Sequence, residues 1–312
     1  MRILFTGASS FTGMWFVKEL AAAGHEVHAP LLHSRSEYSG TRLQRVQKLK
    51  EYATLYDNIP FGSRLFLDLI ETQPSWDLFC HHAADVTDYK NPQFDYAAAL
   101  ANNTHNLEEV LGTLQNRGCH RILLTGSIFE QGEGEGNDDL RAVSPYGLSK
   151  GLTSAVFTYF AAIKKMSLGK FVIPNPFGPY EEFRFTSFLV KTWYEEKVAS
   201  VTHPDYLRDN IPVSLLAKAY SHFADDLDSY SGFHKLNPSG YTGTVGEFTA
   251  LFAEALRPRL FLPCEYDLKP QEDYSEPRTR INSDVLDHTL LQWDEDKAWD
   301  DLARYYKETY GS

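Results

Sequence analysis

The chain has 312 residues, of which 43% are hydrophobic and 23% are charged, and its formal net charge is -12. This size and composition predict a soluble globular protein with a large core, and the negative charge argues against nucleic acid or an anionic membrane as a partner. No run of about 18 apolar residues predicts a membrane-spanning helix. The three cysteines form no Cys-x-x-Cys pair, which favours a reduced, cytoplasmic compartment.

The N-terminal segment reads as strand, glycine turn, helix and strand. Ile3–Phe5 is a short apolar run typical of a buried strand. After the turn Thr6–Gly13, residues 14–23 have a helical pattern that Gly24 ends, and 25–29 predict a second strand. A dinucleotide-binding turn requires this context, because backbone N–H groups at the helix N-terminus then face a pyrophosphate.

The rest of the chain continues this alternation of helices and strands. Residue patterns predict further helices over 41–52, 65–71, 94–117, 185–198, 213–224, 245–256 and 299–310, and strands over 76–84, 120–125, 171–173 and 233–237.

A candidate catalytic set lies in the middle of the chain. A predicted strand ends at Ser127, and Tyr146 and Lys150 have the Tyr-x-x-x-Lys spacing that places both side chains on one face of a helix. A phenol has a pKa near ~10, and a neighbouring ammonium lowers it. The three residues together indicate proton transfer to or from an alcohol oxygen, coupled to hydride transfer. By itself the spacing is weak evidence, since a solvated helical turn produces it too.

These motifs resemble those of the extended short-chain dehydrogenase/reductases, also called the NAD-dependent epimerase/dehydratase family, of the nucleotide-sugar type. Gly7 and Gly13 match the outer glycines of Gly-x-x-Gly-x-x-Gly, Ser10 replaces the middle one, and Ser144–Lys150 is similar to Ser-Pro-Tyr-x-x-Ser-Lys. The resemblance implies an α/β fold with a doubly wound parallel sheet (Rossmann) and a smaller, discontinuous lobe. It divides the chain into a dinucleotide-binding domain, 1–174 plus 208–238, and a substrate-binding lobe, 175–207 plus 239–312.

The resemblance also assigns roles to single residues. Tyr146 would exchange the proton, Lys150 would hold the nicotinamide ribose, and Ser127 would position the sugar oxygen. The adenine position falls on Asn58, with Asp57 as its competitor, and the family's helix asparagine has no assigned counterpart. The implied cofactor contacts are Gly7, Ser9, Ser10, Phe11, Gly13, Arg35, Asn58, Ile59, Ala83, Ala84, Tyr146 and Lys150.

The segment after the second strand indicates whether the cofactor is NAD or NADP. Residues 30–33 contain no acid that would hold the ribose hydroxyls of NAD, and Arg35 follows, with Arg42 and Arg45 beyond it. Because a guanidinium suits the 2′-phosphate of NADP, NADP is favoured over NAD. The alternative is that Arg35 is a solvated loop charge. No metal site is predicted, since the adjacent His81 and His82 have no third ligand spaced near them.

The C-terminal half carries the implied substrate contacts. Asn175 lies in a turn similar to the family's Asn-x-x-Gly-Pro, and Arg208 begins a segment that resembles Arg-Asp-aromatic-Ile-x-Val, whose arginine meets a diphosphate. Arg278 is a further candidate near the nucleotide. A homodimer is also implied, through small and apolar residues of the helix after Tyr146, namely Ala155, Val156, Phe160 and Ala161.

Several reactions are consistent with this set. The family's dehydratases have Asp-Glu after the catalytic serine, whereas Ile128 and Phe129 stand here, so dehydration is disfavoured. The acidic, glycine-rich segment 130–139 is expected to be a flexible loop over the site. A 4-keto reductase of a nucleotide-diphosphate sugar is favoured, with a 4-epimerase that keeps its cofactor as the alternative. A non-catalytic dinucleotide sensor and an enzyme for a non-sugar alcohol or ketone also remain open.

Overall fold

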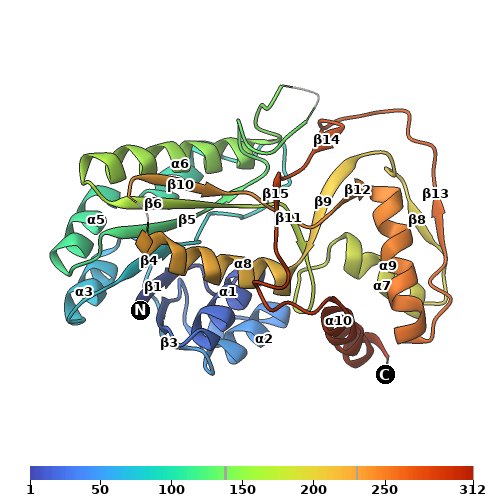
Figure 1. Ribbon diagram of the computed structural model, residues 1–312, viewed down its shortest axis with the longest axis horizontal. Helices are drawn as coiled ribbons and strands as arrows, with labels where there is room; N and C mark the ends of the chain where they lie inside the picture. The colour runs from blue at the N-terminus through green and yellow to red at the C-terminus, as the bar shows by residue number, and fades with distance from the viewer. Residues whose placement is uncertain (137–138, 230, 312) are drawn as a thin grey trace. The chain divides into compact units, whose positions relative to one another are not determined.

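The computed structural model describes residues 1–136, 139–229 and 231–311 (Figure 1). The chain forms two compact units. The first comprises Met1–Glu133, Arg141–Ile173 and Ala217–Asn237, and the second comprises Gly134–Leu140, Pro174–Leu216 and Pro238–Ser312. The sequence-based division had placed 134–140 and 208–216 with the dinucleotide-binding domain, whereas these residues pack within the second unit.

The first unit is built on a seven-stranded parallel sheet in the order β10-β6-β5-β4-β1-β2-β3. The strand order reverses beside β1, with β2 on one side and β4 on the other, and ligands of open α/β sheets bind at the carboxyl ends of strands at such a point. This doubly wound arrangement confirms the predicted Rossmann fold class. The strands are β1 (Arg2–Thr6), β2 (Glu26–Pro30), β3 (Ala53–Tyr56), β4 (Leu78–His81), β5 (Arg121–Ser127), β6 (Ser167–Ile173) and β10 (Phe233–Leu236).

Helices cover both faces of this sheet (Figure 1). On one face, Phe66, Leu111 and Phe157 bring α3, α5 and α6 onto buried strand residues. On the other, Phe16 of α1 stacks on Tyr220 of α8 with ring centroids 4.0 Å apart. The helices are α1 (Phe11–Ala22), α2 (Gly40–Leu49), α3 (Arg64–Thr72), α4 (Tyr96–Asn103), α5 (Leu107–Asn116), α6 (Pro145–Ile163) and α8 (Val213–Asp226), which enters the first unit at Ala217.

Two predicted helices are shorter than expected. The single helix expected over 94–117 is two helices, because Asn106 adopts a left-handed φ of 50° and ends the regular hydrogen bonding between α4 and α5. The helix expected over 185–198 ends at Tyr194, with Glu196 at φ 56°. Both breaks occur at non-glycine residues, which the hydrophobic pattern alone does not mark.

The second unit has its own core and small sheets. β9 (Leu207–Pro212) pairs with the antiparallel β12 and with the parallel β7 and β14. Phe177, Trp193, Phe252, Trp299 and Tyr306 are buried together. The other elements are β7 (Asn175–Phe177), β8 (Ala199–Val201), β11 (Pro238–Ser239), β12 (Tyr241–Thr244), β13 (Tyr266–Leu268), β14 (Thr279–Arg280), β15 (Asp284–Val285), α7 (Phe185–Tyr194), α9 (Val245–Leu260) and α10 (Glu295–Tyr310).

Two further expectations concern the whole chain. None of the helices in the described ranges combines the length and the apolar character that a membrane crossing needs. Cys80, Cys119 and Cys264 are free and buried, as expected for small hydrophobic side chains.

Candidate active site

At the glycine turn, backbone without side chains packs closely against the residues that follow β4. Gly7 has φ +80°, and a Cβ added there would lie 2.6 Å from the backbone nitrogen of Ala83. A Cβ on Gly13 would lie 2.3 Å from the carbonyl oxygen of Gly7. The two glycines are therefore required by close packing of β1, α1 and the residues after β4. A tight turn of this kind, at the N-terminus of a helix, fits the pyrophosphate of a dinucleotide.

Ser10 takes the place of the middle glycine without straining the turn. Its backbone is extended, at φ -73° and ψ 168°, so no glycine is needed there. Its hydroxyl donates to the carbonyl of Gly7 at 2.9 Å and accepts from the N–H of Gly13 at 3.1 Å, which caps α1. The neighbouring Ser9 and Phe11 side chains are buried.

His82 links this turn to β5. Its Nε2 lies 3.0 Å from Ser10 Oγ and 3.1 Å from Thr12 Oγ1, and its Nδ1 lies 3.0 Å from Thr125 Oγ1. Burial, with a smaller contribution from the charge of Lys150, lowers the pKa of His82 to about 3, so its ring is neutral at physiological pH. The sequence predicts no metal site at His82 and does not indicate this bridging role. No group of three His, Cys, Asp or Glu residues in the described ranges forms a metal site.

The arginines after β2 differ in their surroundings. Arg35 is half-exposed and pairs with Asp57 at 2.9 Å, and its contact with a cofactor stays a prediction. Arg42 instead donates from Nη2 to Ser9 Oγ at 2.9 Å, and buried Arg45 donates from Nε to the Ser9 carbonyl at 3.0 Å. Thus two guanidinium groups converge on the glycine turn.

The predicted adenine position lies in the loop after β3. Asn58 has a left-handed φ of 57°, and the Ile59 N–H donates to the carbonyl of Leu31 at 2.8 Å. Ala83 and Ala84 follow β4, where the Ala83 N–H donates to Thr6 Oγ1 at 3.3 Å. Contact of these residues with a cofactor remains a prediction.

The three predicted catalytic residues come from β5 and α6. Ser127 is the last residue of β5, and Tyr146 and Lys150 lie in the first turns of α6, which Ser144 caps. The Tyr146 ring lies 5.4 Å from that of Tyr89 and 6.1 Å from that of Phe94. A helix places residues four apart on one face, so Tyr146 and Lys150 are presented together beside the end of β5.

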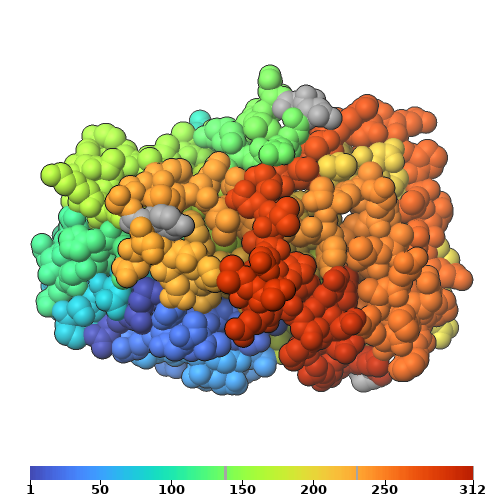
Figure 2. Space-filling model, in the orientation of Figure 1, coloured from blue at the N-terminus to red at the C-terminus, as the bar shows by residue number. Residues whose placement is uncertain are grey.

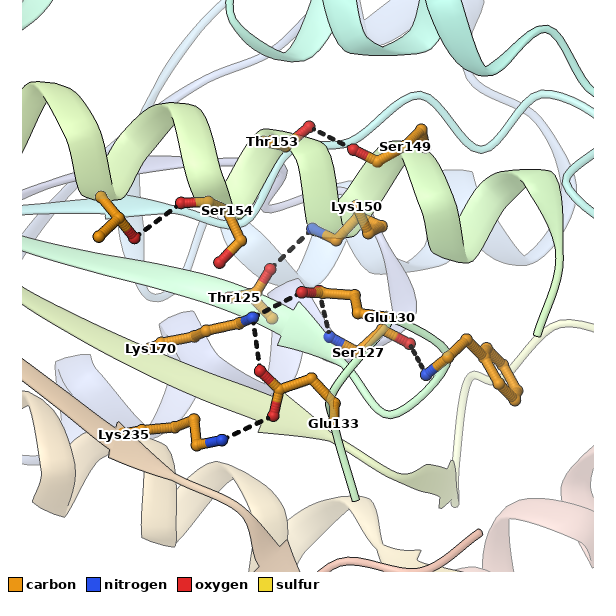
Figure 3. Close-up of polar contacts among 12 residues, drawn as sticks. Thr125, Ser127, Glu130, Glu133, Ser149, Lys150, Thr153, Ser154, Lys170 and Lys235 are labelled. Atoms are coloured by element: carbon orange, nitrogen blue, oxygen red, sulfur yellow. Dashed lines mark hydrogen bonds and ion pairs between the residues drawn. The ribbon is translucent and has the colours of Figure 1, made fainter. Parts of the chain in front are cut away.

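Lys150 is buried, and its Nζ donates to the Thr125 carbonyl at 2.7 Å (Figure 3). Burial lowers its pKa to about 8, while the carboxylate of Glu130 opposes this shift and Lys170 adds to it. The ammonium is therefore close to its titration point at neutral pH, and its charge depends on its neighbours.

The segment after Ser127 is not simply the flexible loop that its composition predicted. Glu130 and Glu133 are buried and pair with buried Lys170 of β6, at 2.6 and 2.8 Å. The expectation of a mobile acidic loop from residue 130 is wrong for these two residues, because a buried lysine requires a charged partner. Residues 137 and 138 lie outside the described ranges.

Asn103, to which the sequence pattern assigns no role, has a defined place in the structure. It is buried in α4, accepts the N–H of Asp85 at 2.8 Å and donates to Thr153 of α6 at 3.3 Å. It therefore holds the segment after β4 close to the helix that carries Tyr146.

The predicted substrate residues all belong to the second unit. Asn175 donates to the Asp209 carbonyl at 3.1 Å. Arg208 donates to the carbonyls of Leu207, Pro277 and Arg278 and pairs with Glu276 at 3.0 Å. The guanidinium of exposed Arg278 lies 3.9 Å from the centre of the Tyr274 ring. Binding of a diphosphate by Arg208 would therefore require it to exchange some of these contacts.

A doubly wound parallel sheet, a tight glycine turn and a Ser/Tyr/Lys set define a dinucleotide-binding α/β protein. The model of the NAD dependent epimerase/dehydratase family matches residues 3–237, and the chain belongs to that family. No curated protein matches the sequence significantly.

Solved structures with the same fold are similar over nearly their whole length. UDP-glucose 4-epimerase from Thermotoga maritima, with UDP-glucose, is 18% identical with a TM-score of 0.71, covering 99% of both chains. UDP-glucuronic acid 4-epimerase from Bacillus cereus, with UDP-glucuronic acid and NAD, is 14% identical with a TM-score of 0.74, covering 99% of this chain and 100% of the other. UDP-glucose-4-epimerase from Stenotrophomonas maltophila, with NAD and formylated UDP-arabinopyranose, is 18% identical with a TM-score of 0.74, covering 99% and 97%.

Proposed function

We propose that the chain is a nucleotide-sugar 4-epimerase that keeps its nicotinamide dinucleotide through the reaction. The observation that carries this proposal is the presentation of Tyr146 and Lys150 by one face of α6, beside the end of β5 that holds Ser127. The sequence had favoured a 4-keto reductase. The solved neighbours support the epimerase alternative better, because they are described as 4-epimerases of UDP-sugars.

In the proposed mechanism, Tyr146 removes the proton of the sugar 4-hydroxyl and later returns it. Ser127 holds that oxygen, and the Lys150 ammonium favours the phenolate form of Tyr146 while it binds a ribose hydroxyl. A bound nicotinamide ring supplies the acceptor and donor of the hydride. Rotation of the 4-keto sugar between the two transfers presents its other face, which inverts the configuration.

Incubation with UDP-hexoses, and separately with a 4-keto UDP-hexose and reduced cofactor, separates the two main reactions. An epimerase interconverts the 4-epimers, measured by chromatography, with no net change in absorbance of the reduced cofactor. A 4-keto reductase instead consumes one reduced cofactor for each 4-keto sugar. Stoichiometric loss of the reduced cofactor without interconversion of epimers would contradict the epimerase proposal.

A non-catalytic dinucleotide sensor is the proposal of a different class. It receives less support, because a binding module gains nothing from a buried lysine beside a tyrosine and a serine. Cofactor binding without turnover of any nucleotide sugar would favour the sensor. An enzyme for a non-sugar alcohol receives less support too, since Arg208 and Asn175 suit a diphosphate.

The surroundings of the turn bear on the identity of the dinucleotide. Arg42 and Arg45 support NADP, as the sequence predicted, whereas two of the neighbours described above bind NAD. We propose Arg42 as the residue that discriminates between them, because its guanidinium donates to Ser9 in the turn, whereas that of Arg35 pairs with Asp57. Placement in the cytoplasm remains a prediction from the cysteines.

The outer surface of α6 supports the proposed homodimer. Tyr159 and Ile163 are 61% and 58% exposed, and Figure 2 shows this yellow-green end of α6 on the surface. Val156 and Phe160 line a hollow of about 760 Å³ between α5 and α6. Among the other residues expected at this contact, Ala155 is exposed but Ala161 is buried in the core, so it does not face a partner.

A further inference from the structure

A cluster of buried charged side chains lies beside the C-terminal end of β5, and the proposed mechanism does not use it. Lys170 of β6 donates to Glu130 Oε2 at 2.6 Å and to Glu133 Oε1 at 2.8 Å (Figure 3). Glu133 Oε2 accepts from the partly exposed Lys235 of β10 at 3.0 Å. Glu130, Glu133 and Lys170 are 0%, 6% and 5% exposed. We call these four residues the charge cluster.

The sheet is shaped to hold this cluster. Lys170 lies between buried residues of β6, a strand that is paired on both sides, where an apolar side chain is usual. Gly126 of β5 leaves the space, since a Cβ there would lie 2.7 Å from Lys170 Cε and 3.1 Å from Glu130 Oε1. Buried ion pairs are costly to desolvate and are weak sources of stability compared with well-packed apolar residues. The cluster therefore calls for an explanation other than stability.

Glu130 connects the cluster to the candidate active site in two ways. Its Oε1 accepts the backbone N–H of Ser127 at 2.7 Å, so one carboxylate holds both Lys170 and the last residue of β5. Glu130 also approaches the part of β5 that holds Lys150, since a Cβ on Gly126 would lie 3.1 Å from Glu130 Oε1 and Lys150 donates to the carbonyl of the preceding residue, Thr125. The charge of Glu130 favours the ammonium of Lys150. Lys170 acts on Lys150 in the opposite sense.

Within the described ranges, the remaining groups that act on Lys150 provide no second negative charge. His81, the last residue of β4, and His82, which follows it, are both held neutral, because burial and then the charge of Lys150 lower their pKa values. On β6 the facing group is Lys170, and the segment after β5 supplies Glu130. Among the described residues with a resolved effect on Lys150, Glu130 is thus the one carboxylate.

We propose that Glu130 is a positioning residue of the candidate site, which fixes the backbone of Ser127 and supplies the negative charge that acts on the ammonium of Lys150. This inference rests on the proposed function only for its catalytic consequence. The charge of Lys150 matters there because an uncharged amine no longer favours the phenolate of Tyr146.

The direct test is titration of Lys150 by NMR in protein labelled with ¹³C-lysine, with the Cε signal assigned by Lys150→Met. Glu130→Gln keeps an oxygen to accept the Ser127 N–H but removes the charge. We expect its Lys150 midpoint to fall by about one pH unit or more, a tenfold lower ratio of charged to neutral lysine at a given pH. Glu133→Gln is the matched control, since it removes the same charge from the same cluster, and its midpoint should stay near that of the wild type. An unchanged midpoint in Glu130→Gln, or an equal shift in both variants, would overturn the proposal.

A double variant guards against failure to fold. Glu130→Gln combined with Lys170→Met removes both partners of one ion pair, so neither is left buried alone. Because Lys170 opposes the charge of Lys150, the midpoint in the double variant should lie above that of Glu130→Gln and below that of Lys170→Met alone. Equal midpoints in the double variant and in Lys170→Met would count against the role of Glu130.

Activity provides a second and separable readout. If the protein epimerises nucleotide sugars, the alkaline limb of kcat/KM should move to lower pH in Glu130→Gln and not in Glu133→Gln. A wild type without turnover would contradict the proposed function while the NMR titration still tests Glu130. Turnover with an unmoved alkaline limb in Glu130→Gln would contradict the inference alone.

Discussion

Ser10 shows how a single residue departs from a family pattern without changing the turn. The sequence marked it as a departure from the middle glycine, and the structure gives the reason that it is tolerated. Its φ of -73° is accessible to any residue, and its hydroxyl caps α1. His82 lies beside it and joins the turn to Thr125.

Arg42 is the residue proposed to discriminate NADP from NAD. Its guanidinium lies at Ser9 in the glycine turn, so Arg42→Ala should weaken binding of NADP by about tenfold or more and change binding of NAD little. Calorimetry with each dinucleotide measures both affinities. Arg35→Ala is the control, since that side chain pairs with Asp57 at the surface. Equal effects of Arg42→Ala on both dinucleotides would remove Arg42 as the discriminating residue.

Sequence reasoning identified the candidate catalytic residues because their roles follow from short spacings and from a family resemblance. The partners of these residues could not be predicted from the sequence, because they lie on different strands and loops that only the folded sheet brings into contact. Glu130 is three residues from Ser127, but its ion pair with Lys170 spans forty positions. The sequence contains one signal of this ion pair. Lys170 directly precedes the predicted apolar strand 171–173, and a lysine buried there needs a charged partner.

At the scale of elements, the order of strands and helices was predictable because buried parallel strands are short apolar runs between turns. β3 was missed, since its residues are mostly half-buried and lie at the edge of the sheet. The break between α4 and α5 was missed as well, because it depends on the left-handed conformation of Asn106 and not on glycine or proline.

α7 and α10 are joined through a buried carboxyl group. Glu181 accepts from Thr186 at 2.5 Å and from Tyr306 at 2.8 Å, and burial raises its pKa to about 7 from an ordinary value of 4.5. Between these two values the folded protein binds more protons than the unfolded chain, so the free energy of unfolding falls as pH rises through this window. The stability contributed by protonated Glu181 is present below the unfolded pKa and is lost above the folded one.

Urea unfolding measured at pH about 5 and about 8 tests this coupling. The wild type should lose up to roughly 3 kcal/mol through Glu181 over this range, and Glu181→Gln should lose correspondingly less. Glu182→Gln, at the more exposed neighbouring residue, should keep the pH dependence of the wild type. The same pH dependence in Glu181→Gln as in the wild type would show that Glu181 does not titrate as described.

At the scale of the whole molecule, the chain has two units with separate cores. The predicted dinucleotide and catalytic residues belong to the first, and Asn175, Arg208 and Arg278 to the second. The sequence anticipated two parts but placed their boundaries differently, because β9 continues the polypeptide toward α8 while its hydrogen bonds join it to β7, β12 and β14.

The proposed homodimer is also tested at this scale. A double substitution on the outer face of α6, Tyr159→Glu with Ile163→Glu, should convert a particle of twice 35.5 kDa into one of 35.5 kDa in light scattering. Burial of two added charges in an apolar contact is the physical reason. Val285→Glu, on an exposed residue of the second unit, should leave the mass unchanged. A wild type that is already monomeric would contradict the dimer.

The central claim is that the phenol of Tyr146 moves the proton while the hydride is exchanged. Tyr146→Phe removes only this hydroxyl, and Tyr159→Phe makes the same change on an exposed part of the same helix. Epimerisation of a nucleotide sugar and affinity for the dinucleotide are measured for both variants. We predict that Tyr146→Phe loses at least about 10²-fold in kcat with the dinucleotide affinity within about twofold of the wild type, and that Tyr159→Phe changes neither. Full activity of Tyr146→Phe would contradict the account.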